Sequence, residues 1–510
     1  MALWGFYFLV KIALYYKGVL QLDAPWNLAF AIFLLIPHPK LLAKLRVARF
    51  ARGAVNVVLG LSLLWHDSWL APLRDTIHFI RQQGLPSPEY ILGHLLNFFT
   101  LETTMPVLIG AIICVVADRY VKLVPVAVVV VIVIGGIQFY GKSKMDVKEV
   151  SAMEDSFFDY ESSRVVNFQK PKLGEIDFDI IFIHVCSLAW DDMKLIEMGN
   201  AKFFDQFHYR FTNFNGVTTY SGPAALRILR APCGQTRHID LYNKGLEECY
   251  SMETLKKLGF ETYFAMNHNG KYGGFLEEVS GNGHVVAPLL SNAGLLVDKK
   301  MFDGSPLVED YSALANWWKV REKQAKHAPA ALYYNTVTLH DGVTWAGMPG
   351  LPTTPQRYKE FLSKLFADVT KFFGLLSASG KNFVVVFIPE HGVALRGSAI
   401  QTPGLRDIPL PSITSLPVAI KFIGPKYNDV PVHGAEVSKP ISYLAVAHQL
   451  KYFIEHNPFA GSFNKKAVVE ELPTTDFVSE NESARIILVD GRYYYQGKDK
   501  KWVQLSPDQM

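Results

Sequence analysis

Three side chains of types that commonly bind metals follow two apolar runs that lie far apart in the sequence. The run Phe178 to Val185 is followed by Cys186, and the run Phe383 to Ile388 is followed closely by Glu390 and His391. Each run has the length and composition of a strand that is buried on both faces of an open α/β sheet. In such sheets functional groups lie at the carboxyl ends of the strands, where the strand order reverses. The sequence therefore predicts that the thiol, the carboxylate and the imidazole converge on one ion.

Ser221 adds a hydroxyl from a segment between these two runs. It lies in Thr218-Thr-Tyr-Ser-Gly-Pro-Ala-Ala-Leu-Arg-Ile-Leu-Arg230, at the predicted start of a helix. A thiolate, a carboxylate, an imidazole and an alkoxide are ligands that Zn²⁺ accepts in tetrahedral geometry, although several other ions compete for such sites. Zinc lowers the pKa of a bound oxygen, which makes a serine alkoxide available near neutral pH. A helix that begins at Gly222 would also direct free N–H groups at phosphoryl oxygens, so we expect Ser221 to attack a phosphodiester.

Each of these residues also has a purely structural explanation. Free cysteine is among the most buried residue types, so Cys186 could fill the core. Ser221 precedes a Gly-Pro pair and could serve only as a helix N-cap. The sequence Glu390-His391-Gly392 could form a turn after a strand. The metal-site hypothesis depends on the whole set, because all four side chains lie at element boundaries expected on one edge of a sheet.

Two further side chains are weaker candidates for the same site. Arg406, in Gly404-Leu-Arg-Asp407, could bind a phosphate through two parallel hydrogen bonds, although most arginines in polar loops are only solvated. Tyr220 directly precedes Ser221 and could help to shape the site, but its sequence position is the only argument for it.

The elements that must position these residues alternate between strands and helices after about residue 173. Strands separated by helices of this length predict an α/β domain with a mixed, mostly parallel sheet covered by helices on both faces. Asp490-Gly491 lies between two β-rich runs and predicts a hairpin. Besides the two runs above, we expect strands at Phe260–Met266, Ala331–Leu339 and Leu416–Phe422, and helices at Asp191–Met198, Glu253–Leu258, Arg357–Ser377 and Ile441–Ile454.

The first 141 residues are dominated by long apolar runs and predict a transmembrane domain of about five helices. The run Val124 to Ile137 is apolar throughout. The second and third candidates have apolar cores shorter than the roughly 20 residues that a spanning helix needs, so their limits stay open. The candidate spans are Leu3–Leu22, Trp26–Pro37, Val55–Trp65 with its flanks, Phe98–Ala117 and Val121–Tyr140.

The distribution of charge predicts the orientation of these helices. The expected loop after the second span contains Lys40, Lys44, Arg46, Arg49 and Arg52 and no acidic residue, which places it in the cytoplasm. With an odd number of spans, the N-terminus is cytoplasmic and everything after Tyr140 lies outside. The segment His66–Thr103 then also lies outside, as its lack of positive bias allows. The first apolar stretch contains lysines and lacks a small-residue cleavage site, so we expect no cleaved signal peptide.

Residues 142–172 are polar and charged, and we expect them to form a linker to a catalytic domain over residues 173–510. Cys233 and Cys249 are close enough in sequence to close a short loop, and in an oxidising compartment this disulfide would contribute about 3 kcal/mol. Two unpaired thiols are the alternative. The formal net charge is +4 over 510 residues, so nothing indicates nucleic acid as a partner.

Together these motifs resemble the membrane-anchored phosphoethanolamine transferases of the alkaline phosphatase superfamily. In that family a ligand at the first strand end, a hydroxyl nucleophile at a helix N-terminus and a late acidic-His-Gly sequence hold a zinc ion. The similarity covers most of residues 176–454, and the N-terminal helices are similar in kind. Cys186 replaces the usual carboxylate, Ser221 the usual threonine and Glu390 the usual aspartate. With these three replacements the chain resembles the cellulose phosphoethanolamine transferases of bacterial cellulose secretion systems. The stretches that carry this resemblance are Phe182-Ile-His-Val-Cys-Ser187 and Ile388-Pro-Glu-His-Gly-Val393.

The resemblance implies a specific reaction. Phosphoethanolamine would pass from phosphatidylethanolamine to Ser221, forming a covalent phosphoethanolamine-serine intermediate, and then to the glucose 6-hydroxyl of cellulose with ping-pong kinetics. One zinc ion would be held by Cys186, Ser221, Glu390 and His391. The resemblance also implies a multi-pass protein of the bacterial inner membrane with a periplasmic catalytic domain, which works beside subunits of the cellulose synthase complex.

His340 receives its role only from this resemblance. It ends the strand-like run Ala331–Leu339, and in the family a histidine near that place contacts the phosphoryl group or acts as general acid or base. A structural histidine is an equally open explanation. The catalytic residues implied are therefore Ser221, His340, Arg406 and Tyr220.

Two other functions stay open at this point. A phosphodiesterase or sulfatase of the same superfamily would use the same ligands and differ in the acceptor, although Ala225 stands where the sulfatase signature has arginine. A scaffold subunit of a polysaccharide synthase complex would use the N-terminal helices for docking, but the complete ligand set argues against an inactive domain. The membrane helices favour a transferase, because an anchored domain has ready access to a phospholipid donor.

Overall fold

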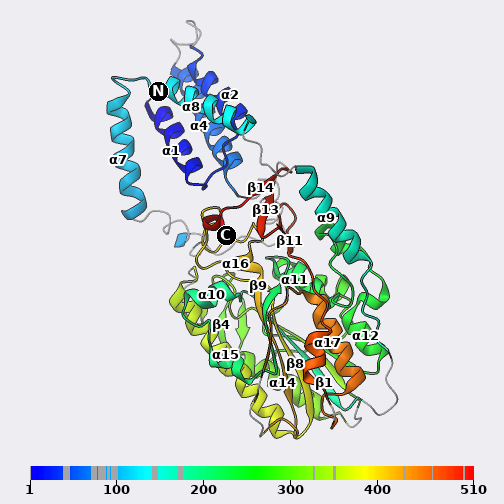
Figure 1. Ribbon diagram of the computed structural model, residues 1–510. Coiled ribbons are helices and arrows are strands. Elements are labelled where there is room, and N and C mark those ends of the chain that lie inside the picture. The colour runs from blue at the N-terminus through cyan, green and yellow to red at the C-terminus, as the bar shows by residue number, and fades with distance from the viewer. Residues whose placement is uncertain are drawn as a thin grey trace.

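The computed structural model has a bundle of N-terminal helices at one end and an α/β domain at the other (Figure 1). The C-terminal strands lie between these two parts (Figure 1). The structure describes residues 2–37, 46–70, 77, 88, 92–93, 101–140, 147–169, 176–324, 328–348, 352–428, 432, 434–461, 463–497 and 500–510.

A seven-stranded sheet forms the centre of the α/β domain. Its strand order is β10-β2-β9-β8-β1-β6-β3. The two pairs that involve β9 are antiparallel and the other four pairs are parallel, which confirms the predicted mixed, mostly parallel sheet. The strands are β1 (Phe178–Val185), β2 (Tyr209–Asn215), β3 (Glu261–Met266), β6 (Ala330–Thr336), β8 (Asn382–Pro389), β9 (Ser415–Ile423) and β10 (Ala435–Val437).

Helices cover both faces of this sheet, as the sequence predicts. All eight residues of β1 are buried, and their side chains alternate between two apolar clusters. Ile180 and Phe182 pack in one cluster, whereas Ile181 and Ile183 pack in the other. This alternation explains why the run is apolar on both faces apart from Asp179 and His184. The first cluster includes residues of α11 (Ser221–Leu229), α12 (Ser251–Lys257), α13 (Phe275–Gly281) and α17 (Tyr443–His456), and the second those of α10 (Trp190–Leu195), α14 (Asp310–Glu322) and α15 (Pro355–Ala378).

One apolar run contains a strand that is shorter than predicted. The run Ala331–Leu339 leaves the sheet at Thr336, although its last residues stay buried. The amide of Val337 donates to the Oδ1 atom of Asn267, so hydrogen bonding to a side chain replaces the ladder there. His340 therefore lies in a turn beyond the strand end.

Two small sheets accompany the central one. The predicted hairpin is confirmed, because β12 and β13 are joined at Asp490 and Gly491, whose φ angles of 49° and 74° suit a tight type I′ turn. The small antiparallel sheets consist of β11 (Val478–Glu480), β12 (Arg485–Val489), β13 (Arg492–Gln496) and β14 (Trp502–Gln504), and of β4 (Val297–Lys300), β5 (Pro306–Val308) and β7 (Thr344–Trp345).

The segment expected to be a linker is in large part a helix. α9 (Val147–Ser162) packs Val150, Phe157 and Phe158 against the sheet of β11 to β14. The Nη1 atom of Arg485 also lies 3.2 Å from Glu154 Oε1. The linker prediction for residues 142–172 is therefore wrong over α9, because its apolar residues share one helix face that only a distant strand segment covers. The domain limits at 141 and 172 stay predictions.

The predicted disulfide between Cys233 and Cys249 is present. It joins the end of α11 to the segment before α12. Val165 forms a β-bridge with Cys233, so the chain after α9 is also held at this point.

Five helices match the five apolar segments at the N-terminus. Among the described residues, Arg46–Asp67 is long and apolar enough to cross a membrane, and the apolar stretches of the other four are shorter. The structure thus confirms the helices, whereas their crossing of a bilayer stays a prediction. The helices are α1 (Ala2–Tyr16), α2 (Ala24–Leu35), α4 (Arg46–Asp67), α7 (Leu101–Ala117) and α8 (Leu123–Tyr140).

The basic loop used to predict orientation is only partly a loop. Arg46, Arg49 and Arg52 belong to the first turns of α4, which corrects that assignment. Lys40 and Lys44 lie outside the described residues, as does most of the segment 66–103.

Buried polar contacts join three of these helices. The Nζ atom of Lys11 lies 2.6 Å from Asp67 Oδ2, and the Nδ2 atom of Asn27 donates to the same oxygen at 2.6 Å. The bundle also contacts the C-terminal sheet, because the rings of Trp69 and Tyr495 lie 5.2 Å apart. The segment that follows α4 is therefore in direct contact with the C-terminal sheet.

Candidate functional site

Cys186, Glu390 and His391 meet at the carboxyl ends of two neighbouring strands. β1 and β8 are parallel with Val185 opposite Pro389, so the residues that follow each strand emerge side by side. The Sγ atom of Cys186 lies 3.9 Å from the Nε2 atom of His391. The ligand atoms of all three residues lie within 4.8 Å of one another, and all three are buried. The predicted convergence is confirmed, and this group of side chains can hold a metal ion.

Ser221 joins this group as the first residue of α11. Its Oγ atom lies 3.4 Å from the Sγ atom of Cys186 and 3.5 Å from the Nε2 atom of His391. The N-cap position of α11 is occupied by Tyr220, whose side chain makes no capping hydrogen bond. Helix capping therefore does not account for Ser221, and its hydroxyl points at the two potential ligands.

Hydrogen bonds orient His391 and Glu390 for ligation. The Nδ1 atom of His391 lies 2.8 Å from the carbonyl oxygen of Gly392, so we place the ring proton there and the lone pair on Nε2. The Oε1 atom of Glu390 accepts from Asn335 Nδ2 at 2.6 Å. The other oxygen, Oε2, is buried, lies 3.7 Å from His391 Nε2 and, among the residues that the structure describes, has no hydrogen-bond partner. A buried carboxylate oxygen without a partner is unfavourable, and a cation at this place would satisfy it.

Burial, and to a smaller extent the neighbouring Glu390 carboxylate, raise the pKa of the Cys186 thiol to about 12. Burial also raises the pKa of Glu390 to about 7 and lowers that of His391 well below its usual value. By itself the site therefore favours neutral side chains. Metal ligation requires the thiolate and the carboxylate, so a bound cation would reverse the effect on both groups.

Arg406 lies at the edge of this group. Its Nη1 atom is 3.3 Å from Ser187 Oγ and 3.5 Å from His391 Nε2. The guanidinium group is partly exposed and brings a fixed positive charge to the site. The structure thus brings Arg406 together with Cys186, Ser221, Glu390 and His391.

Tyr220 and His340 lie close to this group and make other hydrogen bonds. The hydroxyl of Tyr220 donates to Asp407 Oδ1 at 2.8 Å, so this side chain contacts the Arg406 loop. The Nδ1 atom of His340 lies 2.8 Å from the carbonyl oxygen of Asp341. Burial and the charge of Arg406 lower the pKa of His340 to about 4, so the ring is neutral, and a proton on Nδ1 leaves the lone pair on Nε2.

Aromatic side chains form the wall around His340. Its ring lies 5.3 Å from that of Phe302 and 6.0 Å from that of Tyr272. The pKa of Tyr272 is raised mainly by burial, and the charges of Arg406 and Cys186 also act on it. This wall therefore faces the same site.

Three residues that support the site have no counterpart among the sequence predictions. Asn335 is the penultimate residue of β6, next to β1, so the rule about strand ends could have found it. Asp192 accepts from the amides of Val393 and Leu395 at 2.8 and 2.9 Å and shapes the chain after His391. Asn481 donates to the carbonyl oxygens of Arg406 and Asp407 at 3.3 and 3.1 Å. Nothing in the local sequence marks Asp192 or Asn481.

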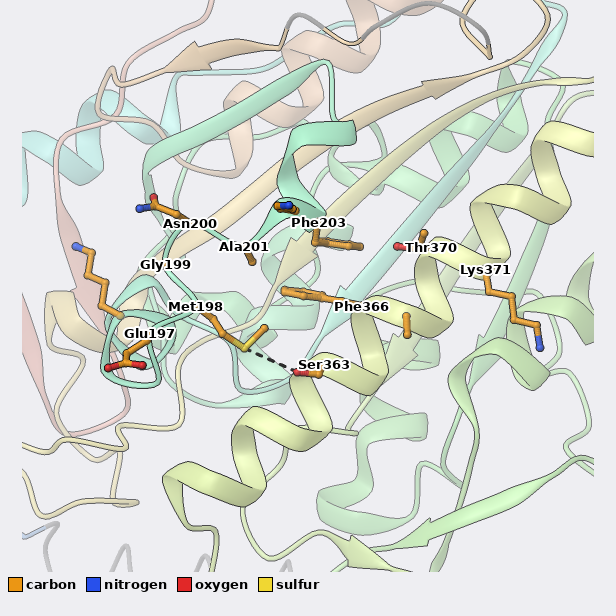
Figure 2. Close-up of a pocket in the computed structure, with 13 residues that line it drawn as sticks. Glu197, Met198, Gly199, Asn200, Ala201, Phe203, Ser363, Phe366, Thr370 and Lys371 are labelled. Carbon is orange, nitrogen blue, oxygen red and sulfur yellow. Dashed lines mark hydrogen bonds between the residues drawn. The ribbon is translucent and has the colours of Figure 1, made fainter.

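A surface groove of about 950 Å³ lies apart from these side chains (Figure 2). It is formed by residues near α10, by η1 (Lys202–Gln206) and by α15. None of the seven candidate site residues lines it, namely Cys186, Tyr220, Ser221, His340, Glu390, His391 and Arg406. Phe203 and Phe366 both line the groove, and their rings stack at 4.0 Å (Figure 2). The groove is therefore distinct from the group around Ser221.

Comparison with solved structures gives matches to bacterial proteins. A protein in the alkaline phosphatase superfamily from Vibrio parahaemolyticus is 12% identical, with a TM-score of 0.45, over 73% of this chain and 93% of that one. The lipooligosaccharide phosphoethanolamine transferase A from Neisseria meningitidis is 10% identical, with a TM-score of 0.41, over 74% of this chain and 78% of that one.

Comparisons of the sequence identify the family of this chain. The family model described as "Cellulose biosynthesis protein BcsG C-terminal domain" matches residues 138–502, and the corresponding N-terminal domain matches residues 4–136. The proteins named Cellulose biosynthesis protein BcsG from Escherichia coli K12 and Salmonella typhimurium are each 32% identical to this chain. Both alignments cover 98% of this chain and 95% of the relative. From these matches over both parts of the molecule, we conclude that the chain belongs to the BcsG family of cellulose biosynthesis proteins.

Proposed function

We propose that this protein is a zinc-dependent transferase that moves phosphoethanolamine from phosphatidylethanolamine to the glucose 6-hydroxyl of cellulose. The observation that carries the proposal is the position of Ser221, whose Oγ atom lies 3.4 Å from Cys186 Sγ and 3.5 Å from His391 Nε2. This is the arrangement of a nucleophile beside potential metal ligands. Membership of a family named for cellulose biosynthesis supports the acceptor, and the resemblance to phosphoethanolamine transferases supports the transferred group.

Zinc suits the types and the spacing of the four side chains. Zinc–ligand distances of roughly 2.0 to 2.3 Å in a tetrahedron place neighbouring ligand atoms roughly 3.3 to 3.8 Å apart. Four separations among Cys186, Ser221, Glu390 and His391 measure 3.4, 3.5, 3.7 and 3.9 Å. The unpartnered Glu390 Oε2 supports a cation at the same place. When bound, zinc would supply the positive charge that favours a serine alkoxide and balances charge on the phosphoryl group.

In the first step the Ser221 oxygen attacks phosphorus. The new Oγ–P bond forms as the bond from phosphorus to the diacylglycerol oxygen breaks, and that oxygen takes up a proton equivalent to the one that Ser221 loses. The guanidinium group of Arg406 and the free amides at the start of α11 bind the phosphoryl oxygens. His340, with its free Nε2 lone pair, exchanges the proton.

In the second step a glucose 6-hydroxyl attacks the phosphorus of the phosphoethanolamine-serine. The bond from phosphorus to Ser221 breaks, the sugar oxygen loses its proton, and Ser221 regains one. Two displacements at one nucleophile predict ping-pong kinetics. The same steps with water in place of the sugar would make a phosphodiesterase.

The location that we propose is the bacterial inner membrane, with several spans and a periplasmic catalytic domain. The helix Arg46–Asp67 and the shorter apolar helices beside it support membrane insertion. The Cys233–Cys249 disulfide supports an oxidising compartment for the α/β domain. The N-terminal helices are then free to contact subunits of the cellulose synthase complex.

Mass spectrometry of the full chain tests this proposal. Zinc-loaded protein in detergent, exposed to phosphatidylethanolamine, should gain the mass of one phosphoethanolamine on Ser221, whereas Ser221→Ala should gain none. Ser251→Ala is the matched control, because Ser251 also begins a helix but lies on α12. Cello-oligosaccharide added afterwards should remove the adduct and carry the phosphoethanolamine.

Other results would favour other functions. Release of free phosphoethanolamine with or without the sugar would indicate a phosphodiesterase. Zinc-loaded protein that forms no adduct and turns over no donor would refute catalysis and favour a scaffold subunit.

A further inference from the structure

We infer that Glu278 binds the ammonium group of the phosphoethanolamine headgroup and so selects the donor lipid. The inference rests on the proposed function and adds a specificity-determining residue to it. Glu278 lies on α13, which packs against α11.

The carboxylate of Glu278 contacts the backbone directly beside the proposed nucleophile. A Cβ atom added at Gly222 would lie 2.7 Å from the carboxyl carbon of Glu278 and 2.9 Å from its Oε1 atom. Such separations are far below van der Waals contact, so a side chain at residue 222 would require the Glu278 carboxylate to move. Because Gly222 follows Ser221, the carboxylate lies next to the place where a phosphoryl group on Ser221 would be held.

This carboxylate lacks a cation. Within the part of the chain that the structure describes, its oxygens make no hydrogen bond and no ion pair. Burial raises the pKa of Glu278 to about 7, and no nearby positive charge opposes this effect. A partly buried carboxylate is stabilised when an opposite charge comes close.

An unpaired carboxylate would repel a phosphate group that carries no positive charge of its own. Arg406 and the free amides of α11 attract the phosphoryl oxygens, whereas Glu278 would repel them. Phosphoethanolamine resolves this conflict, because it carries an ammonium group two carbons from the phosphoryl oxygen. The phosphate can then face Arg406 and Ser221 while the ammonium pairs with Glu278.

The surroundings of α13 agree with a role at the site. The short helix η4 (Tyr272–Gly274) leads directly into α13, and its Tyr272 is close enough to Arg406 and Cys186 for their charges to act on it. Tyr272 and Glu278 thus come from one segment that forms a wall of the site.

Two chromogenic esters with the same leaving group test the inference. One is p-nitrophenyl phosphoethanolamine, and the other is the propyl ester, in which a methyl group replaces the ammonium. The zinc-loaded full chain should prefer the ammonium ester. In Glu278→Gln, kcat/KM for the ammonium ester should fall roughly 10- to 100-fold, as for a lost charged hydrogen bond, while the propyl ester reacts as before.

Two more variants make the test specific. Glu278→Asp keeps the charge and should retain part of the preference, and an unchanged zinc content would show that both variants are folded. Glu277→Gln is the matched control, because Glu277 is the exposed neighbour on the same helix.

Failure of the inference and failure of the proposed function would give different results. Equal losses for both esters in Glu278→Gln, or a wild type without preference, would overturn the role of Glu278 but leave the proposed function standing. A zinc-loaded wild type that turns over neither ester would overturn the proposed function and the inference with it.

Discussion

The hydroxyl of Tyr220 donates a 2.8 Å hydrogen bond to Asp407 Oδ1, and these two residues are the chain neighbours of Ser221 and Arg406. The same two segments are joined a second time, because the Thr219 hydroxyl donates to the carbonyl oxygen of Arg406. The proposed nucleophile and the proposed phosphate-binding arginine are therefore held by one set of hydrogen bonds. We expect Tyr220 to act through this set.

Replacing Tyr220 by phenylalanine should weaken this connection without removing a ligand. A hydrogen bond to a charged group contributes about 1.5 to 3 kcal/mol, so we expect kcat/KM for the donor to fall by roughly 10-fold or more. Zinc content should not change. Tyr427→Phe is the control, because it removes a buried hydroxyl that donates to the carbonyl oxygen of Pro458, away from the site. Equal activities of the two variants would contradict the positioning role.

Asn335→Ala should lower the affinity for zinc. Asn335 Nδ2 donates to Glu390 Oε1 at 2.6 Å, and its Oδ1 atom lies 2.9 Å from His268 Nε2. Loss of a side chain that orients a ligand typically costs 10- to 100-fold in metal affinity. Competition with a chelator measures this change, and Asn316→Ala, at a surface asparagine of α14, is the control. Unchanged affinity would show that Glu390 needs no such support.

Substitutions at Cys186 distinguish a ligand from a core residue. If the thiolate binds zinc, Cys186→Ala should lose roughly 100-fold or more in zinc affinity, which exceeds the loss from a supporting residue. Cys186→Asp should recover part of it, because a carboxylate is also a zinc ligand. Cys114→Ala, at the free cysteine of α7, should bind zinc as the wild type does. Full zinc content in Cys186→Ala would leave only a packing role.

The disulfide should contribute to stability. The bridge from Cys233 to Cys249 spans a sequence separation of 16, and closing a loop of this size stabilises a protein by about 3 kcal/mol. The double variant Cys233→Ser, Cys249→Ser should lose this amount in chemical unfolding followed by tryptophan fluorescence. Reducing the wild type should have the same effect, and a loss below about 1 kcal/mol would contradict the prediction.

Acid should destabilise the domain through His208. Burial, with help from Lys465 and Lys421, lowers the pKa of His208 to about 3, and its Nδ1 atom accepts from the amide of Phe422 at 3.0 Å. As the pH falls below 6.5, the His208 side chain takes up a proton in the unfolded chain but not in the folded chain. The contribution of this side chain to the free energy of unfolding is therefore fully present above pH 6.5 and is lost as the pH falls toward 3. At about pH 5 the loss is about 2 kcal/mol.

Unfolding at about pH 7 and about pH 5 measures this effect. His208→Gln keeps an acceptor for the Phe422 amide but cannot take up the proton, so its stability should fall less between the two values. His456→Gln, at an exposed histidine, should behave as the wild type. Identical losses in wild type and His208→Gln would assign acid sensitivity to other groups.

Local sequence patterns were enough to predict much of this protein. The apolar runs at Phe178–Val185, which only Asp179 and His184 interrupt, and at Phe383–Ile388 identify strands that need burial on both faces, and the structure confirms both. Asp490-Gly491 identifies a hairpin because few other residues accept positive φ at both positions. The rule that side chains at carboxyl strand ends meet then brings Cys186 close to Glu390 and His391.

Other features depended on contacts between distant segments. The apolar face of α9 is covered by strands more than 300 residues later, so its composition alone resembled a linker. Asn481 and Glu278 carry no local signal, because each acts on a segment that only the folded chain brings near. Residue types and their periodicity thus determined which groups could do chemistry and which strands carry them. Only the tertiary structure decided which polar side chains orient the functional groups. Such pairs of residues are far apart in the sequence, so their contacts produce no periodic pattern in it.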